Sequence, residues 1–287
     1  MTLVNDTTFQ LGDTGVVLND DTLPNVPFID IEVVTGLDSA PFRQTKREHE
    51  GVDGGFMDAE FESGRDISLQ GVVYANNNPI ETYLDTLKAN WAPSTALVPL
   101  YYYTLETGLR VVFVKPLGCQ YDWDALRRTG MTAITFTAYA EDPRIYSGAL
   151  LSANLPMGAT IFTGFAFNLG FSFGFGGVST TTDGQFVYNT GNRPAPVTMT
   201  ITGPVTNPVI MNDTTSSVMQ FNITLGVTDT LTINSQYHTV RLNGTTNRRS
   251  TLIVPGWFNL QVGGNFIRFR GAGGTGTLTV AYRASWR

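Results

Sequence analysis

Few side chains in this sequence could take part in nucleophilic or metal-assisted chemistry. The chain of 287 residues has two histidines, His49 and His238, and a single cysteine, Cys119. His49 lies in a charged run, His238 lies at the start of an expected strand, and their spacing matches no zinc motif. No neighbour of Cys119 is of a type that activates a thiol. Since a catalytic triad needs a base beside its nucleophile, the sequence predicts no enzyme, and neither a metal nor another cofactor.

Two further patterns could be mistaken for an active site. The glycine-rich residues 170–177 and 271–276 lack the Gly-Lys-Ser/Thr ending of a phosphate-binding loop. Acidic pairs at residues 122 and 124 and at 141–142 would serve a glycosidase only if the fold held two carboxylates about 5–10 Å apart. We interpret the glycines as close strand connections and the acids as solvated turn residues.

Charge is distributed unevenly along the chain. Residues 1–145 have 21 acidic and 10 basic side chains, a net charge of −11, whereas residues 146–287 have 3 acidic and 8 basic ones, a net charge of +5. This asymmetry indicates two modules with different surroundings. The first half would repel phosphate, which argues against nonspecific binding of nucleic acid there.

Alternating residues and turn signals predict a mainly β chain with one helix. Apolar residues alternate with polar ones at residues 28–34 and 131–140, as in half-buried strands. The helix is predicted between Pro79, which suits its first position, and Pro93. Its apolar stripe consists of Ile80, Tyr83, Leu84, Leu87 and Trp91. From residue 189 onward, short strands separated by turns are typical of a β-sandwich.

Three acidic residues alternate along one expected strand. Asp58, Glu60 and Glu62 would project from one face, and like charges placed in this way destabilise a sheet unless they are neutralised or solvated. Two interpretations stay open. The face is either a wet edge neutralised by a base such as Arg65, or a surface that is meant to be negative.

Bulky and small residues also alternate between residues 165 and 175. The bulky ones are Phe165, Phe167, Leu169, Phe171, Phe173 and Phe175. Period two predicts an extended segment with one apolar face, because a spanning helix needs about 20 mainly apolar residues and the recurrent glycine opposes one. The apolar face belongs either to the core of the second domain or to a contact with a neighbouring subunit.

Seven segments, taken in order, carry a resemblance that covers nearly the whole chain. They are Arg47–Gly55, Ser63–Gly71, Ala140–Tyr146, the aromatic-glycine segment 165–175, Asn189–Pro196, Ile201–Pro204 and Asn207–Ile210. Together they resemble the siphophage distal tail proteins, a family common in phages of actinobacteria.

The resemblance implies an N-terminal tail-tube-like belt domain, made of β-sheets plus one helix, and a C-terminal galectin-like β-sandwich. The belt is expected at residues 1–147, an aromatic and glycine-rich arm or linker at residues 148–190, and the sandwich at residues 191–287. The implied protein is a structural virion component at the phage tail tip, assembled in the host cytoplasm without membrane insertion.

The implied assembly is a hexameric ring with a tail tube protein on one face and a tail-tip or baseplate protein on the other. DNA and the tape-measure protein would pass through its axial channel without specific binding. Since an acidic wall repels DNA, Asp58, Glu60 and Glu62 are the expected lumen-facing acids. The apolar face of residues 165–175 would tether the domains or reach a neighbouring subunit.

A competing hypothesis is a lectin-like tail protein that binds host-surface carbohydrate. Its working part would be the sandwich, with Trp257 as the glycan contact. An enzymatic tail protein ranks third, because the sequence lacks a histidine–carboxylate constellation. Fold alone does not confer sugar binding.

Overall fold

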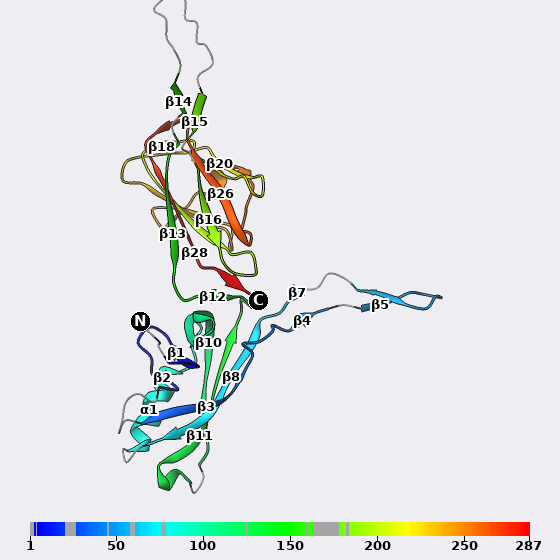
Figure 1. Ribbon diagram of the computed structural model, residues 1–287, viewed down its shortest axis with the longest axis vertical. Coiled ribbons are helices and arrows are strands. Elements are labelled where there is room, and N and C mark those ends of the chain that lie inside the picture. The colour runs from blue at the N-terminus through cyan, green and yellow to red at the C-terminus, as the bar shows by residue number, and fades with distance from the viewer. Residues whose placement is uncertain are drawn as a thin grey trace, which may run out of the picture. The chain divides into compact units, whose positions relative to one another are not determined.

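A computed structural model describes residues 3, 5–20, 27–44, 46–57, 61–75, 79–123, 126–158, 160–163, 178–181 and 184–287. The chain divides into two compact units. The first unit consists of residues 1–149 together with Arg287, and the second of residues 150–286. Strands dominate both units, and the described residues contain one α-helix, so the expected mainly β fold with one helix is confirmed (Figure 1).

The first unit contains strands β1 to β12, helix α1 and a short 3-10 helix. Their bounds are β1 (Thr8–Leu11), β2 (Val17–Leu18), β3 (Phe28–Thr35), β4 (Phe42–Arg43), β5 (Lys46–Glu48), β6 (Gly55–Met57), β7 (Phe61–Glu62), β8 (Arg65–Tyr74), α1 (Ile80–Asn90), β9 (Val98–Thr104), β10 (Gly108–Tyr121), η1 (Leu126–Thr129), β11 (Met131–Ala140) and β12 (Ile145–Ser147).

The main sheet of the first unit is antiparallel and has the order β2-β1-β9-β10-β11-β8-β3, with β12 pairing with β10. The strands predicted at residues 28–34 and 131–140 are β3 and β11. Along β8 the side chains alternate, so that Ile67 and Leu69 are buried whereas Asp66 and Gln70 are exposed. One face of this part of the sheet therefore lies on the core and the other faces solvent.

Helix α1 covers the core face of this sheet. Its buried side chains are Ile80, Leu84 and Leu87, and the Trp91 ring lies 4.7 Å from that of Phe136 on β11. Burial raises the pKa of Tyr83 to about 12. Pro79 is the cap residue rather than the first helical residue, a difference of one position from the prediction.

An arm of two short ribbons leaves the main sheet between β3 and β8 (Figure 1). One ribbon pairs β4 with β7, and the other pairs β5 with β6. Residues 46–57 of the arm are all exposed. The arm therefore has no core of its own among its described residues, whereas an isolated two-stranded ribbon is at best marginally stable in water.

The second unit contains the remaining strands. Their bounds are β13 (Leu151–Pro156), β14 (Thr160–Thr163), β15 (Val178–Thr181), β16 (Gly184–Asn189), β17 (Val197–Thr202), β18 (Val205–Thr206), β19 (Val209–Asn212), β20 (Ser217–Phe221), β21 (Thr224–Leu225), β22 (Thr230–Asn234), β23 (Thr239–Leu242), β24 (Thr246–Asn247), η2 (Arg249–Thr251), β25 (Leu252–Pro255), β26 (Gly263–Arg270), β27 (Gly273–Gly274), β28 (Thr277–Tyr282) and β29 (Ser285–Trp286).

Two antiparallel sheets enclose the core of the second unit. One has the order β13-β28-β17-β22-β23-β24, and the other has the order β16-β26-β19-β20-β25. Both contribute to a single apolar cluster that includes Met199, Leu231 and Val280 from the first sheet and Phe221 and Phe269 from the second. This shared core matches the two-layer arrangement expected of a sandwich. Its likeness to galectins stays a prediction.

The expected arm or linker at residues 148–190 contributes strands to the second unit at both of its ends. β13 pairs with β28 over six residues, and β16 pairs with β26 over six residues. Local β propensity could not predict these pairings, because the partner strands β28 and β26 lie about 80 to 130 residues away in the sequence. Both strands belong to the second compact unit, which begins at residue 150.

Candidate functional site

Of the three acids expected to face a channel, one lies within the described residues. Asp58 and Glu60 lie outside the described residues. Glu62 is the last residue of β7, its side chain is 5% exposed, and its carboxylate accepts a hydrogen bond from Arg287 Nε at 2.6 Å. The Arg287 guanidinium also lies 5.4 Å from the centre of the Phe42 ring. Glu62 is therefore covered and paired with a base, so this residue offers no open negative surface.

A different acidic surface lies on the solvent face of the main sheet. Asp30 and Glu32 on β3 and Asp66 on β8 are all exposed. Asp30 is opposite Val72 of β8, so it shares the face from which Asp66 projects. Glu32 lies at the bulge where the register of β3 shifts. This group, named the acidic sheet face, has no equivalent in the sequence-based site prediction.

The basic group nearest in register does not neutralise the acidic sheet face. Lys115 on β10 is aligned with Tyr139, which is aligned in turn with Asp66. The Lys115 ammonium, however, donates to the Glu141 carboxylate. The signal that could have identified the face was the alternation at residues 28–34, where Asp30 lies between two buried isoleucines and Glu32 follows the second of them.

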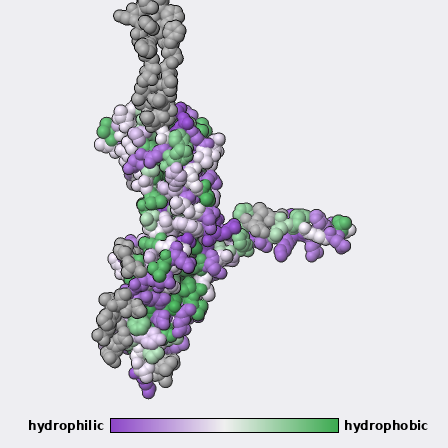
Figure 2. Space-filling view, in the orientation of Figure 1, coloured by the Kyte–Doolittle hydropathy of each residue, from purple (hydrophilic) through white to green (hydrophobic). Residues whose placement is uncertain are grey.

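The arm carries a second candidate surface. Its exposed apolar side chains, with their exposed fractions, are Phe42 (43%), Val52 (71%), Phe56 (47%), Met57 (50%) and Phe61 (59%). Figure 2 shows apolar and polar side chains together on the surface of this arm. Exposed apolar side chains gathered on one segment are typical of a protein-interaction surface rather than of a free monomer surface.

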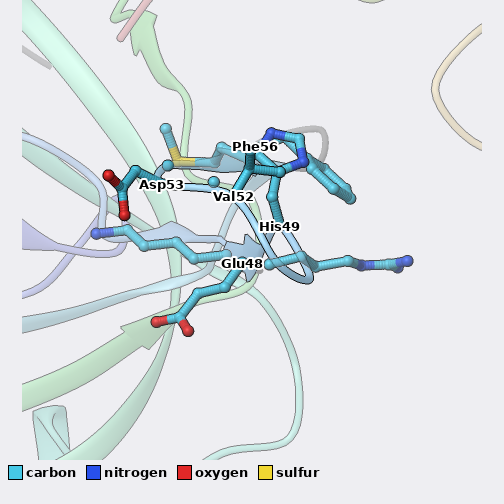
Figure 3. Close-up of a pocket in the computed structure, with 10 residues that line it drawn as sticks. Glu48, His49, Val52, Asp53 and Phe56 are labelled. Atoms are coloured by element: carbon cyan, nitrogen blue, oxygen red, sulfur yellow. The ribbon is translucent and has the colours of Figure 1, made fainter.

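The outer ribbon of the arm encloses a hollow of about 620 Å³, lined by residues 46–49 and 52–57 (Figure 3). The His49 and Phe56 rings contact each other with their centres 5.3 Å apart. Every lining residue is exposed, and two paired strands with the turn between them form the whole wall. A small-molecule site buries most of its ligand, so this hollow suits a partner surface better.

Two of the segments that carry the sequence resemblance meet around a buried arginine. Arg65 is fully buried, and its guanidinium donates to the carbonyl oxygens of Gly36 and Pro143. Gly64, beside it, has no room for a side chain, because a Cβ there would lie 2.3 Å from the Tyr139 hydroxyl. Arg65 therefore ties the base of the arm to the segment that follows β11.

The segment Asn189–Pro196 forms a similar structural connection in the second unit. The Asn189 side chain donates to the carbonyl oxygens of Arg193 and Leu260 and accepts from the Gly191 amide. A Cβ on Gly191 would lie 1.9 Å from the Ser285 carbonyl oxygen. These residues therefore have backbone-positioning roles in this fold.

The remaining predicted contacts were an aromatic face and Trp257. The bulky residues of segment 165–175 lie outside the described residues. Trp257 is partly buried against the second unit's core, and the His238 imidazole stacks on it with ring centres 4.6 Å apart. The Arg249 guanidinium lies 5.9 Å from the centre of the same ring. A sugar could stack on the Trp257 face that meets His238 only by displacing that imidazole.

Within the described residues, the two histidines and the cysteine each lie in a separate setting. His49 lies in the arm, His238 lies on Trp257, and burial raises the pKa of the half-buried Cys119 thiol. Within these residues, no three His, Cys, Asp or Glu side chains are grouped closely enough to hold a metal ion. Nor does any helix in the described part have the length and apolar character needed to cross a membrane.

Most of the second unit matches a known protein family. Residues 190–286 match the model of the SPP1 Dit family, described as the siphovirus-type tail component, C-terminal domain. This part of the second unit is therefore similar to a siphovirus tail component domain. The matched range begins directly after β16, so the strands β13 to β16 all precede it. A search of curated proteins finds no match.

Solved structures extend the likeness beyond the tail component domain. The crystal structure of SPP1 Dit, described as a paradigm of hub adsorption apparatus in phages that infect Gram-positive bacteria, matches with a TM-score of 0.64 and 14% identity. A protein of the phage p2 baseplate, in its activated conformation with calcium, matches with a TM-score of 0.52 and 13% identity. Each match covers 96% of this chain and 98% of the other. The resemblance to distal tail proteins is confirmed, and the fold is theirs over both units.

Proposed function

We propose that this protein is the hub of a siphophage distal tail, a structural ring that joins the tail tube to the tail tip or baseplate. The observation that carries the proposal is the match of both units, over 96% of the chain, to the fold of a phage hub protein. The family match of residues 190–286 supports a tail component independently. The partners are a tail tube protein on one face of the ring and a tail-tip or baseplate protein on the other.

The first unit forms the ring of this hub and surrounds the channel, and the second unit lies at the periphery. The division of charge supports this arrangement, since residues 1–145 have a net charge of −11 and residues 146–287 one of +5. DNA that moves through a basic channel would bind its wall, whereas an acidic wall repels it. The tape-measure protein and DNA pass without specific binding.

The acidic sheet face lines this channel. Asp30, Glu32 and Asp66 are exposed on strands that pair directly with each other, whereas Glu62 is covered and bound to Arg287. The carboxylates on this face supply a negative surface on paired strands of the main sheet. Asp58 and Glu60, which lie outside the described residues, stay candidates beside them.

Negative-stain electron microscopy of the purified protein, combined with native mass spectrometry, tests the proposal. We expect rings with six-fold symmetry, an open centre and peripheral lobes, and a mass six times that of the 31.3 kDa chain. A compact monomer at every concentration, in the presence or absence of the tail tube protein, would contradict the hub.

A further inference from the structure

The tip of the arm combines negative charge with an exposed apolar side chain. Glu48, Glu50 and Asp53 are exposed at the turn between β5 and β6, and Val52 between them is 71% exposed. Figure 3 shows the carboxylates of Glu48 and Asp53 extending away from the packed His49 and Phe56 rings. These three acids and Val52 are named the acidic tip. A projecting ribbon without a core gains stability when another surface covers it.

The second unit has an excess of arginine that its own carboxylates do not neutralise. Residues 184–286 contain seven arginines, no lysine and two acids, Asp213 and Asp229. Asp213 is paired with Arg268 at 2.6 Å. Asp229 accepts hydrogen bonds from the Asn243 side chain and the Gly226 amide. Both carboxylates are thus already engaged within the unit.

Three of these arginines gather at one edge of the second unit. Arg241 is on β23, which pairs with the edge strand β24. The backbone amide of Arg248 donates to the carbonyl oxygen of Val240, which is also on β23. All of Arg241, Arg248 and Arg249 are exposed, and within the described residues none lies within salt-bridge distance of a carboxylate. Arg241 lies on β23, and Arg248 and Arg249 follow β24, so these charges flank the edge strand and discourage it from pairing with other chains. This explains their exposure but not a fixed geometry.

The geometry of Arg249 goes beyond edge protection. Its guanidinium donates to the His238 carbonyl oxygen at 2.8 Å and lies 5.9 Å from the centre of the Trp257 ring. The His238 ring stacks on Trp257, and Tyr237, which precedes His238 in the sequence, is 62% exposed. An arginine that is oriented in advance, with aromatic neighbours, is a composition enriched at protein interfaces. The three arginines with Tyr237 and Trp257 are named the arginine patch.

We propose that the acidic tip of one copy of this protein docks on the arginine patch of a second copy. The three carboxylates of the tip match the three guanidinium groups of the patch in number and sign, and Val52 packs on the aromatic side chains. Because tip and patch are different surfaces, the contact is head-to-tail and repeats from copy to copy until a ring closes. This inference rests on the proposed homo-oligomeric hub.

Charge reversal on each side, and then on both, tests the docking. One variant carries Glu48→Arg, Glu50→Arg and Asp53→Arg, another carries Arg241→Glu, Arg248→Glu and Arg249→Glu, and a third combines all six changes. Sedimentation velocity at physiological salt should show assembly weakened about tenfold or more by either set, and restored by the combination. The matched control, Asp38→Arg with Glu106→Arg and Asp122→Arg, reverses three exposed acids outside the arm and should assemble normally.

The outcomes separate this inference from the hub proposal. Rings that form equally well in all variants would overturn the docking and leave the hub intact, and so would a combined variant that stays as weak as its parents. A wild-type protein that never assembles would overturn both. Circular dichroism melting of each variant establishes that its units are folded.

Cysteine crosslinking in a Cys119→Ser background distinguishes docking between copies from docking within one. Asp53→Cys protein mixed with Arg248→Cys protein should form a disulfide-linked pair, since a disulfide needs Cα atoms within about 7 Å. Asp38→Cys mixed with Arg248→Cys serves as the control and should not. A double variant that crosslinks only within its own chain, as a monomer, would overturn the proposal.

Discussion

Phenylalanine side chains are buried in the core of the second unit but exposed in the arm of the first unit. Phe221 and Phe269 are completely buried between the two sheets of the second unit, whereas Phe56 and Phe61 of the arm are 47% and 59% exposed. Fully burying such a side chain contributes about 1.5–3 kcal/mol. The second unit gains this free energy when its own chain folds, and the arm can complete that gain only when another surface covers it.

Removing a buried phenylalanine should have the largest effect on this contrast. We expect Phe269→Ala to lower the free energy of unfolding of the second unit by about 3–5 kcal/mol, because the deletion leaves a cavity among residues that are already packed. Denaturant unfolding, monitored by tryptophan fluorescence, measures the change. A loss below about 1 kcal/mol would mean that the two sheets do not share a tightly packed core.

Replacing Arg65 should have the next largest effect, this time on the first unit. Arg65→Met fills a similar space but leaves the partly buried carbonyl groups of Gly36 and Pro143 without this donor. A buried unsatisfied acceptor costs about 1–3 kcal/mol, and we expect a loss in that range by thermal unfolding. Arg65→Lys, which keeps the charge but not the two-carbonyl reach, should recover only part of it. Wild-type stability in Arg65→Met would remove Arg65 from the role of connector.

The exposed phenylalanine of the arm should behave differently from the buried one. Phe61→Ser is expected to change the free energy of unfolding by no more than about 0.5 kcal/mol, because its side chain is 59% exposed in the single chain. Assembly, measured by light scattering over a concentration series, should weaken. A variant that assembles as the wild type does would show that Phe61 stays uncovered in the ring.

The smallest expected effect concerns pH and the second unit. Hydrogen bonds from the Asn243 side chain and the Gly226 amide hold the pKa of Asp229 below its ordinary value. The resulting stabilisation is complete above the unfolded-state pKa, about 3.9, and is lost as the pH falls through the lower folded-state pKa. Asp229→Asn should therefore unfold at a lower temperature than the wild type at pH 6, and the difference should shrink toward pH 2. A difference that is constant with pH would exclude the carboxylate as its origin.

Local periodicity predicted the elements whose pattern is independent of distant partners. The strand at residues 131–140 and the helix that begins after Pro79 follow from alternation and from one apolar stripe. The acids at 30 and 32 were visible in the same way, as the exposed half of an alternating strand. Such a pattern indicates that the opposite face is buried, but it does not indicate a role for the acids, so alternation alone did not predict an acidic surface here.

Pairing between distant segments was not predictable in the same way. The run at residues 56–62 has the alternation of one strand, but its ends belong to two ribbons, β5–β6 and β4–β7. Likewise, nothing local to Glu62 indicates that Arg287, 225 residues away, covers it. The neutralising partner of a charge depends on the fold as a whole, so sequence spacing could not show that Glu62 is covered.

The central claim is that the acidic sheet face of the first unit lines the channel of a ring. A cryo-electron microscopy reconstruction of the assembled protein, at a resolution that places strands β3 and β8, tests it most directly. The account predicts Asp30, Glu32 and Asp66 on the inner wall of a closed ring, facing the axis. A ring in which these three side chains lie on the outer rim, or are buried between copies, would contradict it.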